Sequence, residues 1–180
     1  MANRQALREL QTRLAERLQV ARTEGVAAAW LAVEAGGQKY LFPLSQSGEI
    51  FPWASAHPVP YTQAWFVGVA NLRGGLFGIV DLARFANANA NANAPPNRLN
   101  LSHSDARLVA LNSALEVNCA LLVDRLAGLR KQDAFADFAV KQDSAPDFFG
   151  NQYIDHAGEH WQEINLQTLA RQDHFLTIGA

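Results

Sequence analysis

Two apolar runs joined by a short polar turn form the clearest pattern in this chain of 180 residues. The first run covers residues 66–71 and the second covers 76–82, with Gly74 and Gly75 between them. Because glycine adopts positive φ without steric cost, the pair predicts a tight β-hairpin turn. Large apolar residues occupy both alternating positions of the second run, which is typical of a strand covered on both faces. The hairpin would then display Arg73 at its tip, which suits contact with a partner better than catalysis.

Shorter apolar runs predict further strands before this hairpin. Residues 30–33 and 40–42 flank a glycine pair at 36–37, which indicates an earlier hairpin. Four prolines then interrupt the chain and exclude a long helix before Ala64. They are Pro43, Pro52, Pro58 and Pro60.

The second half of the chain also has strand patterns. Apolar and polar positions alternate over 115–123, which predicts a half-buried strand with Cys119 on its inner side. Residues 151–155 and 161–166 predict a hairpin, followed by a short helix over 166–171.

The first residues have the pattern of an amphipathic helix over 3–24. Its apolar positions recur every three or four residues, at Leu7, Leu10, Leu14, Leu18 and Ala21. Arginine and glutamate occupy the other faces, and Gly25 follows where a helix end favours a left-handed residue. The favoured interpretation is a helix packed on its own domain, and a docking helix for a partner is the alternative. A helix lying on a membrane surface is disfavoured because the stripe is narrow and lacks aromatic residues.

Residues 85–96 have low complexity. Asparagine and alanine alternate over 86–94, and two prolines end the segment. Alternating small and polar residues offer little to pack, so the pattern predicts a mobile loop or a connection between two lobes.

Composition narrows the class of protein. Hydrophobic residues make up 49% of the chain and charged residues 18%, enough to bury a substantial core. The net charge of −2 provides no basic surface for nucleic acid, so nucleic-acid binding is disfavoured. No apolar run approaches the roughly 20 residues that span a bilayer, so a cytosolic, soluble protein without direct membrane insertion is expected. Cys119 is the single cysteine, which excludes an intrachain disulfide.

Two groups of residues could carry chemistry. His156 and His160 match the H-x-x-E-H pattern of one zinc-peptidase class, which requires both histidines on one helix face. Gly158 and strand-like flanks instead predict a hairpin with the histidines beside its turn. Asp81 and Asp124 each follow an aliphatic run, and they could act as an acid–base pair. The favoured interpretation is that each carboxylate ends a strand by accepting backbone N–H groups.

Several motifs follow one another in an order that identifies a family. Residues 68–74 read Gly-Val-Ala-Asn-Leu-Arg-Gly and 79–82 read Ile-Val-Asp-Leu. Weaker matches occur at 37–43, 47–50, 59–60 and 120–126. Together they closely resemble the signature of the CheW-like chemotaxis adaptor family, over about residues 28–170. The N-terminal extension resembles that of PilI-type adaptors in the type IV pilus, or twitching, branch of the family.

The resemblance implies an all-β fold with added helices. Two SH3-like five-stranded β-barrel lobes with a shared core are expected within a CheW-like domain over residues 26–172. The expected parts are a helical extension over 1–25, lobes at about 28–85 and 105–172, a joining loop over 86–96, and a tail over 173–180.

The resemblance also implies a non-enzymatic, cytoplasmic adaptor without a cofactor. Its expected partners are a CheA-type histidine kinase and the cytoplasmic tip of a methyl-accepting chemoreceptor. The partner-binding residues that it implies are Ser47, Glu49, Asn71, Leu72, Arg73 and Gly74. Ser47 stands where many members carry an aliphatic residue that contacts partners, so receptor affinity is expected to be weaker or redirected.

Glu49 and Arg73 are expected to form a bidentate ion pair that fixes the hairpin tip, the alternative being two unconnected solvated charges.

Three other functions remain open. They are a flagellar coupling protein, a scaffold that binds neither kinase nor receptor, and a metal-dependent hydrolase that uses His156 and His160.

Overall fold

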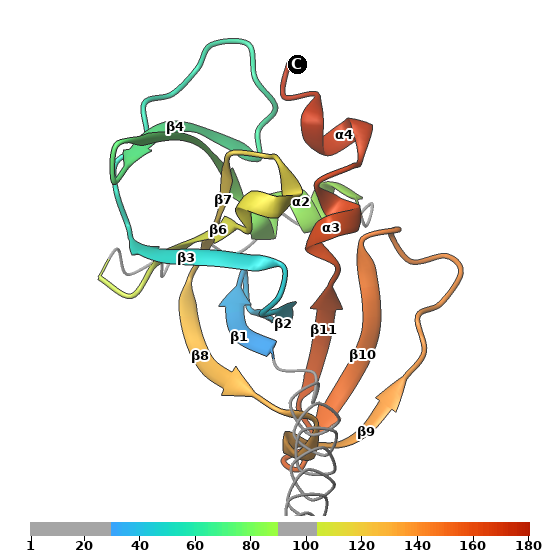
Figure 1. Cartoon of the computed structure of the whole chain (residues 1–180). Coiled ribbons are helices and arrows are strands. Elements are labelled where there is room, and N and C mark those ends of the chain that lie inside the picture. Colours follow the sequence, from blue (N-terminus) through green and yellow to red (C-terminus); the bar gives the residue numbers. More distant parts are fainter. Residues whose placement is uncertain (1–29, 90–103) are drawn as a thin grey trace, which may run out of the picture.

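The computed structural model describes residues 30–89 and 104–180, which form two β-sheets and several short helices (Figure 1). In order across the sheet, the six-stranded sheet contains β8 (Arg125–Arg130), β1 (Trp30–Ala35), β2 (Gln38–Pro43), β11 (His160–Ile164), β10 (Phe149–Asp155) and β9 (Phe135–Ala139). The five-stranded sheet contains β3 (Ser47–Pro52), β6 (Arg107–Leu111), β7 (Cys119–Val123), β5 (Gly75–Asp81) and β4 (Phe66–Leu72). The prediction of a mostly β fold is confirmed, and the predicted helix over 3–24 lies outside the described residues.

Short helical segments connect or follow the strands. They are α2 (Leu82–Asn89), α3 (Leu166–Leu169), α4 (Asp173–Leu176) and the 3₁₀ turns η1 (Ser113–Leu115) and η2 (Gln132–Ala134). No helix among the described residues is long and apolar enough to span a membrane.

The two sheets exchange strands between the halves of the chain. β2 pairs in parallel with β11, and β5 pairs in parallel with β7, so each sheet contains strands from both halves. The expected lobes at 28–85 and 105–172 are therefore wrong as continuous segments. Parallel neighbours far apart in sequence leave no local pattern, which is why the sequence did not predict this exchange.

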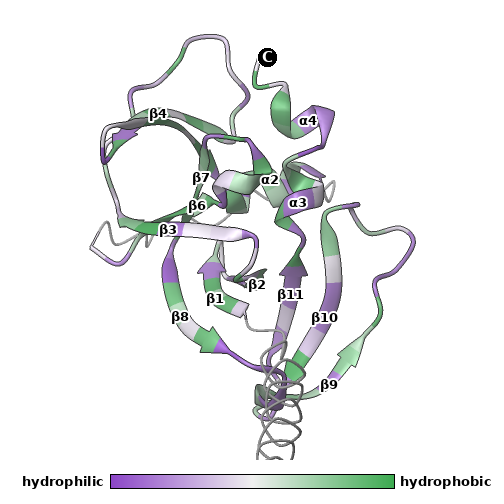
Figure 2. Cartoon of the chain, viewed as in Figure 1, coloured by the Kyte–Doolittle hydropathy of each residue, from purple (hydrophilic) through white to green (hydrophobic). Residues whose placement is uncertain are grey.

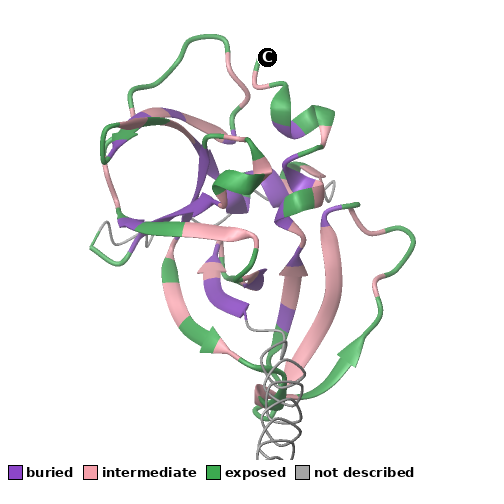
Figure 3. Ribbon diagram, in the orientation of Figure 1, coloured by how far each residue is buried: buried purple, intermediate pink, exposed green. Residues whose placement is uncertain are grey.

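One hydrophobic cluster joins buried residues of both sheets and of the helices. Around α2 and α3, where these elements meet, the ribbon contains apolar stretches in Figure 2 and buried stretches in Figure 3. Phe42 of β2, Leu121 of β7, Ile164 of β11, Phe85 of α2 and Leu169 of α3 are each fully buried in it. The shared apolar core that the resemblance implied is thus confirmed.

Helix α2 corrects the prediction for the start of the asparagine–alanine segment. Phe85 and Ala86 are buried in the shared core, and the Asp81 carboxylate accepts a hydrogen bond from the Arg84 amide at 3.1 Å. The Asn89 amide group donates to the Phe85 carbonyl at 2.8 Å. Alanine favours helix, and the aromatic ring anchors the first turn, so the loop prediction is wrong for residues 86–89.

The chain end is packed, which corrects the predicted tail over 173–180. Phe175 of α4 is buried and stacks on Trp65 with ring centroids 6.3 Å apart. Beyond α4, the Gln63 amide donates to the Ile178 carbonyl at 2.8 Å, and the Ala180 amide donates to the Tyr61 carbonyl at 3.0 Å. The short predicted helix over 166–171 is confirmed by α3.

Strand β7 also differs from its prediction. It begins only at Cys119, and all five of its residues are buried, whereas a half-buried strand over 115–123 was expected. The strand lies between β6 and β5 in the middle of its sheet, with both faces covered. Cys119 is buried, so its predicted inward position is confirmed. This burial raises the pKa of its thiol to about 12.

Candidate partner-binding surface

The hairpin between β4 and β5 ends in a two-residue turn. Leu72 and Gly75 pair across it, and the two central residues, Arg73 and Gly74, have φ of 49° and 84°. Positive φ at both positions defines a type I′ turn, whose twist matches that of the strands. The positive φ predicted for the glycine pair therefore falls one residue earlier, on Arg73 and Gly74. The Asn71 side chain accepts a hydrogen bond from the Gly74 amide at 2.9 Å, which closes the turn.

Arg73 reaches across to the neighbouring strand β3. Its guanidinium Nη1 forms an ion pair with Oε1 of Glu49. The predicted pairing is confirmed, but it consists of this one contact and not of the expected bidentate geometry. The guanidinium also lies 5.9 Å from the ring centre of Phe51, a cation–π distance. The side chains of Arg73 and Glu49 are 76% and 44% exposed, so the pair contributes at most about 1 kcal/mol to stability. The main physical effect of the ion pair is to hold the exposed guanidinium in one orientation.

A surface hollow of about 240 Å³ lies beside this ion pair. Glu49 and Phe51 of β3 line it, and so do Phe77 of β5, Val117 and Asn118, together with residues of the segment 110–113. The hollow thus combines an apolar aromatic wall with a carboxylate and an amide at its rim. This combination suits a protein side chain with an apolar body and a polar end better than a small charged substrate.

A glycine that lines this hollow lets two neighbouring strands approach closely. A Cβ atom at Gly48 would lie 2.7 Å from the carbonyl oxygen of Leu111, closer than a real Cβ contact allows. Glycine at this position therefore lets β3 approach β6 and places Glu49 next to the hairpin tip.

The six residues implied by the resemblance do not all share one surface. Glu49, Asn71, Arg73 and Gly74 gather at the exposed tip. Leu72 is only 5% exposed and packs in the hydrophobic cluster of the five-stranded sheet, so its side chain does not face solvent at the tip. Ser47 is half-buried, and its hydroxyl donates to the Pro43 carbonyl at 3.0 Å.

Sequence reasoning missed the aromatic wall of the hollow. Phe51 follows Glu49 by two residues on β3, so both side chains project from the same face of the strand. That spacing is a usable signal once the strand is known. Phe77, in contrast, was predicted only as a covered residue of the second run.

The two histidines flank the turn between β10 and β11. His160 pairs with Ile154 across the strands, and Nε2 of His156 lies 2.9 Å from the Asp133 carbonyl oxygen. The predicted hairpin is confirmed, and the helix that a zinc peptidase needs is replaced by strands. In the part of the chain that the structure describes, no three His, Cys, Asp or Glu side chains lie close enough to bind a metal ion.

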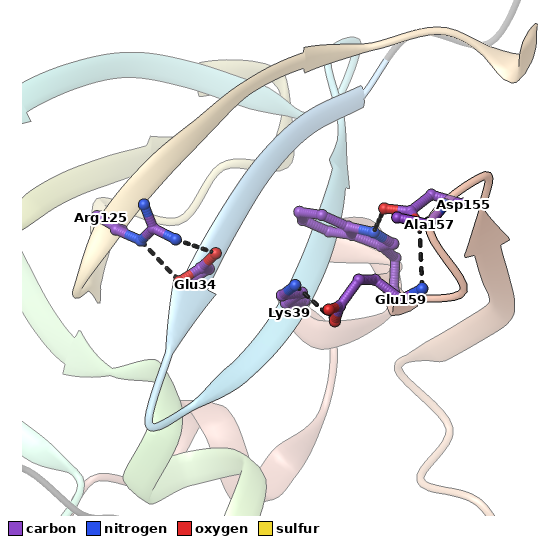
Figure 4. A network of polar contacts seen from close by, with 7 residues as sticks. Glu34, Lys39, Arg125, Asp155, Ala157 and Glu159 are labelled. Carbon is purple, nitrogen blue, oxygen red and sulfur yellow. Dashed lines mark hydrogen bonds and ion pairs between the residues drawn. The ribbon is translucent and has the colours of Figure 1, made fainter. Parts of the chain in front are cut away.

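A polar network stabilises this hairpin (Figure 4). Asp155 accepts hydrogen bonds from the Trp161 indole at 3.0 Å and from the Ala157 and Glu159 amides at 2.9 and 3.0 Å. These donors, the indole above all, lower the pKa of the Asp155 carboxyl. Glu159 in turn forms an ion pair with Lys39 of β2 at 2.7 Å. These contacts show that the polar residues around the turn stabilise the hairpin.

Asp81 and Asp124 also have structural contacts. The Asp124 carboxylate accepts a hydrogen bond from the Gly36 amide at 2.7 Å, and the Asp81 carboxylate caps the first turn of α2 through Arg84. The predicted role of both carboxylates as acceptors of backbone N–H groups is confirmed.

An exposed, ion-paired hairpin beside a hollow with an aromatic wall is a typical feature of protein-interaction surfaces. The model of the CheW-like domain family matches residues 29–173, and the chain belongs to this family. Members of this family are non-catalytic adaptors.

Known proteins that are similar to the chain include one relative by sequence and one by structure. It is 26% identical over 148 residues to Protein PilI of Pseudomonas aeruginosa, an alignment that covers 80% of this chain and 76% of PilI. It also resembles the crystal structure of the scaffolding protein TtCheW from Thermoanaerobacter tengcongensis, with a TM-score of 0.58 at 15% identity. That match covers 77% of this chain and 89% of TtCheW and, at this identity, shows the fold alone.

Proposed function

We propose that this adaptor couples the cytoplasmic tip of a methyl-accepting chemoreceptor to a CheA-type histidine kinase, without catalysing a reaction itself. Membership of the CheW-like family supports the adaptor role. We choose the hairpin tip as the binding surface because the Arg73 side chain there is both exposed and ion-paired.

The hairpin tip has the physical properties of an interface anchor. The type I′ turn and the contacts of Arg73 with Glu49 and Phe51 fix the guanidinium before a partner arrives. A pre-oriented side chain loses little conformational entropy on binding, so more of its interaction energy contributes to affinity. Arginine is also among the residue types most often found at binding hot spots.

The pathway that we propose is type IV pilus-mediated twitching motility. The similarity to Protein PilI over 80% of the chain supports this assignment. A flagellar chemotaxis coupling protein is the alternative within the same family, and the identity of the kinase that co-purifies with the chain would separate the two.

Arg73→Ala tests the proposed surface. We expect it to weaken binding to the receptor tip or the kinase by about 2 kcal/mol, roughly thirtyfold, because a hot-spot arginine is lost. Its melting temperature should fall by less than about 4 °C, since an exposed ion pair stabilises the fold only weakly. Glu49→Ala should weaken binding in the same direction. The double variant should lose less than the sum of both because the two residues contact each other.

Arg125→Ala is the matched control. Arg125 makes two hydrogen bonds to Glu34 at 2.6 and 2.7 Å, and its side chain is 60% exposed, but it lies on the other sheet. Each variant is titrated with the purified receptor tip and kinase domain by calorimetry, beside a thermal melt. Normal binding by Arg73→Ala, or an equal loss in Arg125→Ala, contradicts the proposed surface. Unfolding of Arg73→Ala would make this residue structural.

A further inference from the structure

Gln46 lies in the short connection between β2 and β3, where the chain passes from the six-stranded sheet to the five-stranded sheet. Its side-chain Oε1 accepts hydrogen bonds from the Leu166 and Gln167 amides, at 2.7 and 3.3 Å, where α3 begins after β11. Its backbone carbonyl accepts another from the amide of Asn112, which follows β6, at 3.0 Å. Because β11 and β6 belong to different sheets, one half-buried residue joins the connection to both.

The partners of Gln46 are themselves held in place. Leu166 is fully buried in the shared core, which fixes the start of α3. The side-chain amide of Asn112 donates to the Ser45 carbonyl at 3.3 Å, and its Oδ1 accepts from the Ala114 amide at 2.9 Å. The position of residue 46 is therefore set by contacts with both sheets, although the neighbouring Ser45 is exposed.

Strand β3 begins directly after Gln46 and is irregular where it carries Glu49. Its pairing with β6 shifts register between Ser47 and Ile50, where two residues of β3 oppose one of β6. Such a β-bulge bends the strand and changes the direction of its side chains. Glu49 lies in this bulge, so the direction of its carboxylate depends on how the strand is held at its start.

We propose that Gln46 is a positioning residue for the hairpin tip. By holding the start of β3, it fixes the bulge and directs the Glu49 carboxylate toward the Arg73 guanidinium. Its importance for partner binding rests on the function proposed above. Without the Oε1 acceptor, the start of β3 gains freedom, and Glu49 spends part of its time away from Arg73. The arginine then loses part of the pre-orientation that favours binding.

Gln46→Met tests this role, because methionine keeps the length of the side chain and removes the acceptor. Asn165→Ala is the matched control, since the Asn165 side chain also caps α3. Within the described chain, the hydrogen bonds of Asn165 lead to Phe148, Thr168 and Leu169 rather than to β3. Both substitutions remove an acceptor at the start of the same helix, so both melting temperatures should fall by about 2–4 °C.

The first measurement needs no partner. In nitrogen–proton correlation spectra of the purified chain, Glu49→Ala shows how the Arg73 and Gly74 amide signals shift when the ion pair is lost. We expect Gln46→Met to move the same two signals in the same direction. Gln46→Glu keeps an acceptor oxygen at the same reach and should leave them in place, as should Asn165→Ala.

The second measurement is the affinity for the purified receptor tip and kinase domain. Gln46→Met should weaken binding about fivefold, because the partner must then fix the orientation of the Arg73 side chain. Gln46→Glu and Asn165→Ala should bind like the unsubstituted chain. If Gln46→Met does not fold, Gln46→Ala, which also lacks the acceptor, repeats both measurements.

The spectra and the affinities separate the possible failures. Tip signals that stay in place in Gln46→Met, or that shift equally in Asn165→Ala, overturn the inference. Normal affinity of Gln46→Met overturns its role in binding. If the unsubstituted chain binds neither receptor tip nor kinase, the proposed function fails, and the tip signals still decide whether Gln46 holds Glu49.

Discussion

Replacing Phe175 with alanine should destabilise the whole domain, although this residue lies only five positions from the chain end. Phe175 is 3% exposed, stacks on Trp65 and meets Phe85 edge-on with ring centroids 5.3 Å apart. Removing a buried phenylalanine costs about 3–5 kcal/mol through lost burial and the cavity that remains. Because α4 has only four residues, it can open locally and limit this loss, so we expect about 3 kcal/mol.

For a domain of this size, that loss corresponds to a fall of about 6–12 °C in melting temperature. Leu176→Ala is the matched control, because Leu176 follows on the same helix but is 51% exposed. It should cost less than about 1 kcal/mol. Circular dichroism melts and urea titrations of both variants measure the difference. Near-ultraviolet dichroism reports whether the packing around Trp65 is lost.

Equal melting temperatures for Phe175→Ala and Leu176→Ala would refute this reasoning. Residues 173–180, which the sequence pattern predicted as a tail, would then add little to stability, and the ring contacts would contribute nothing measurable.

Further variants test other features of the structure. Gly68→Ala should destabilise by more than about 3 kcal/mol, because its Cβ would lie 2.2 Å from the His57 carbonyl oxygen at a φ of +139°. Gly74→Ala, with open space around it, should cost only about 1 kcal/mol, which chemical denaturation can separate. Burial raises the pKa of Cys119 from its ordinary 9.0 to about 12, so the unfolded chain loses this proton first as the pH rises. The free energy of unfolding should therefore fall above pH 9, and Cys119→Ala should reduce that fall in melts from pH 8 to 11. His156→Ala should leave the melting temperature almost unchanged, and elemental analysis of the unsubstituted protein should find no stoichiometric zinc; one tightly held zinc per chain would revive the hydrolase alternative.

The sequence by itself determined the features that depend on neighbours along the chain. The hairpin over β4 and β5 followed from two apolar runs and a glycine-containing turn. Gly158 and its strand-like flanks likewise predicted a hairpin, which excluded the helix that a zinc peptidase needs. Alternation and turn residues act within a few positions, so such elements can be predicted without knowing the fold.

The sequence predicted only part of the candidate site. Arg73 stood out at a hairpin tip, but its pairing with Glu49 came from the family resemblance, because no local pattern joins residues on separate strands. The aromatic wall formed by Phe51 and Phe77, and the inward direction of Leu72, required the positions of β3, β4 and β5 in three dimensions.

Only the tertiary structure decided how the two halves of the chain combine. The parallel pairing of β5 with β7 and of β2 with β11 exchanges strands between the expected lobes. The same long-range packing turns Phe85 and Phe175, in segments predicted as a loop and a tail, into core residues. Burial against distant residues outweighs weak local preferences, because a few buried aromatic contacts exceed the small differences in propensity between loop and helix.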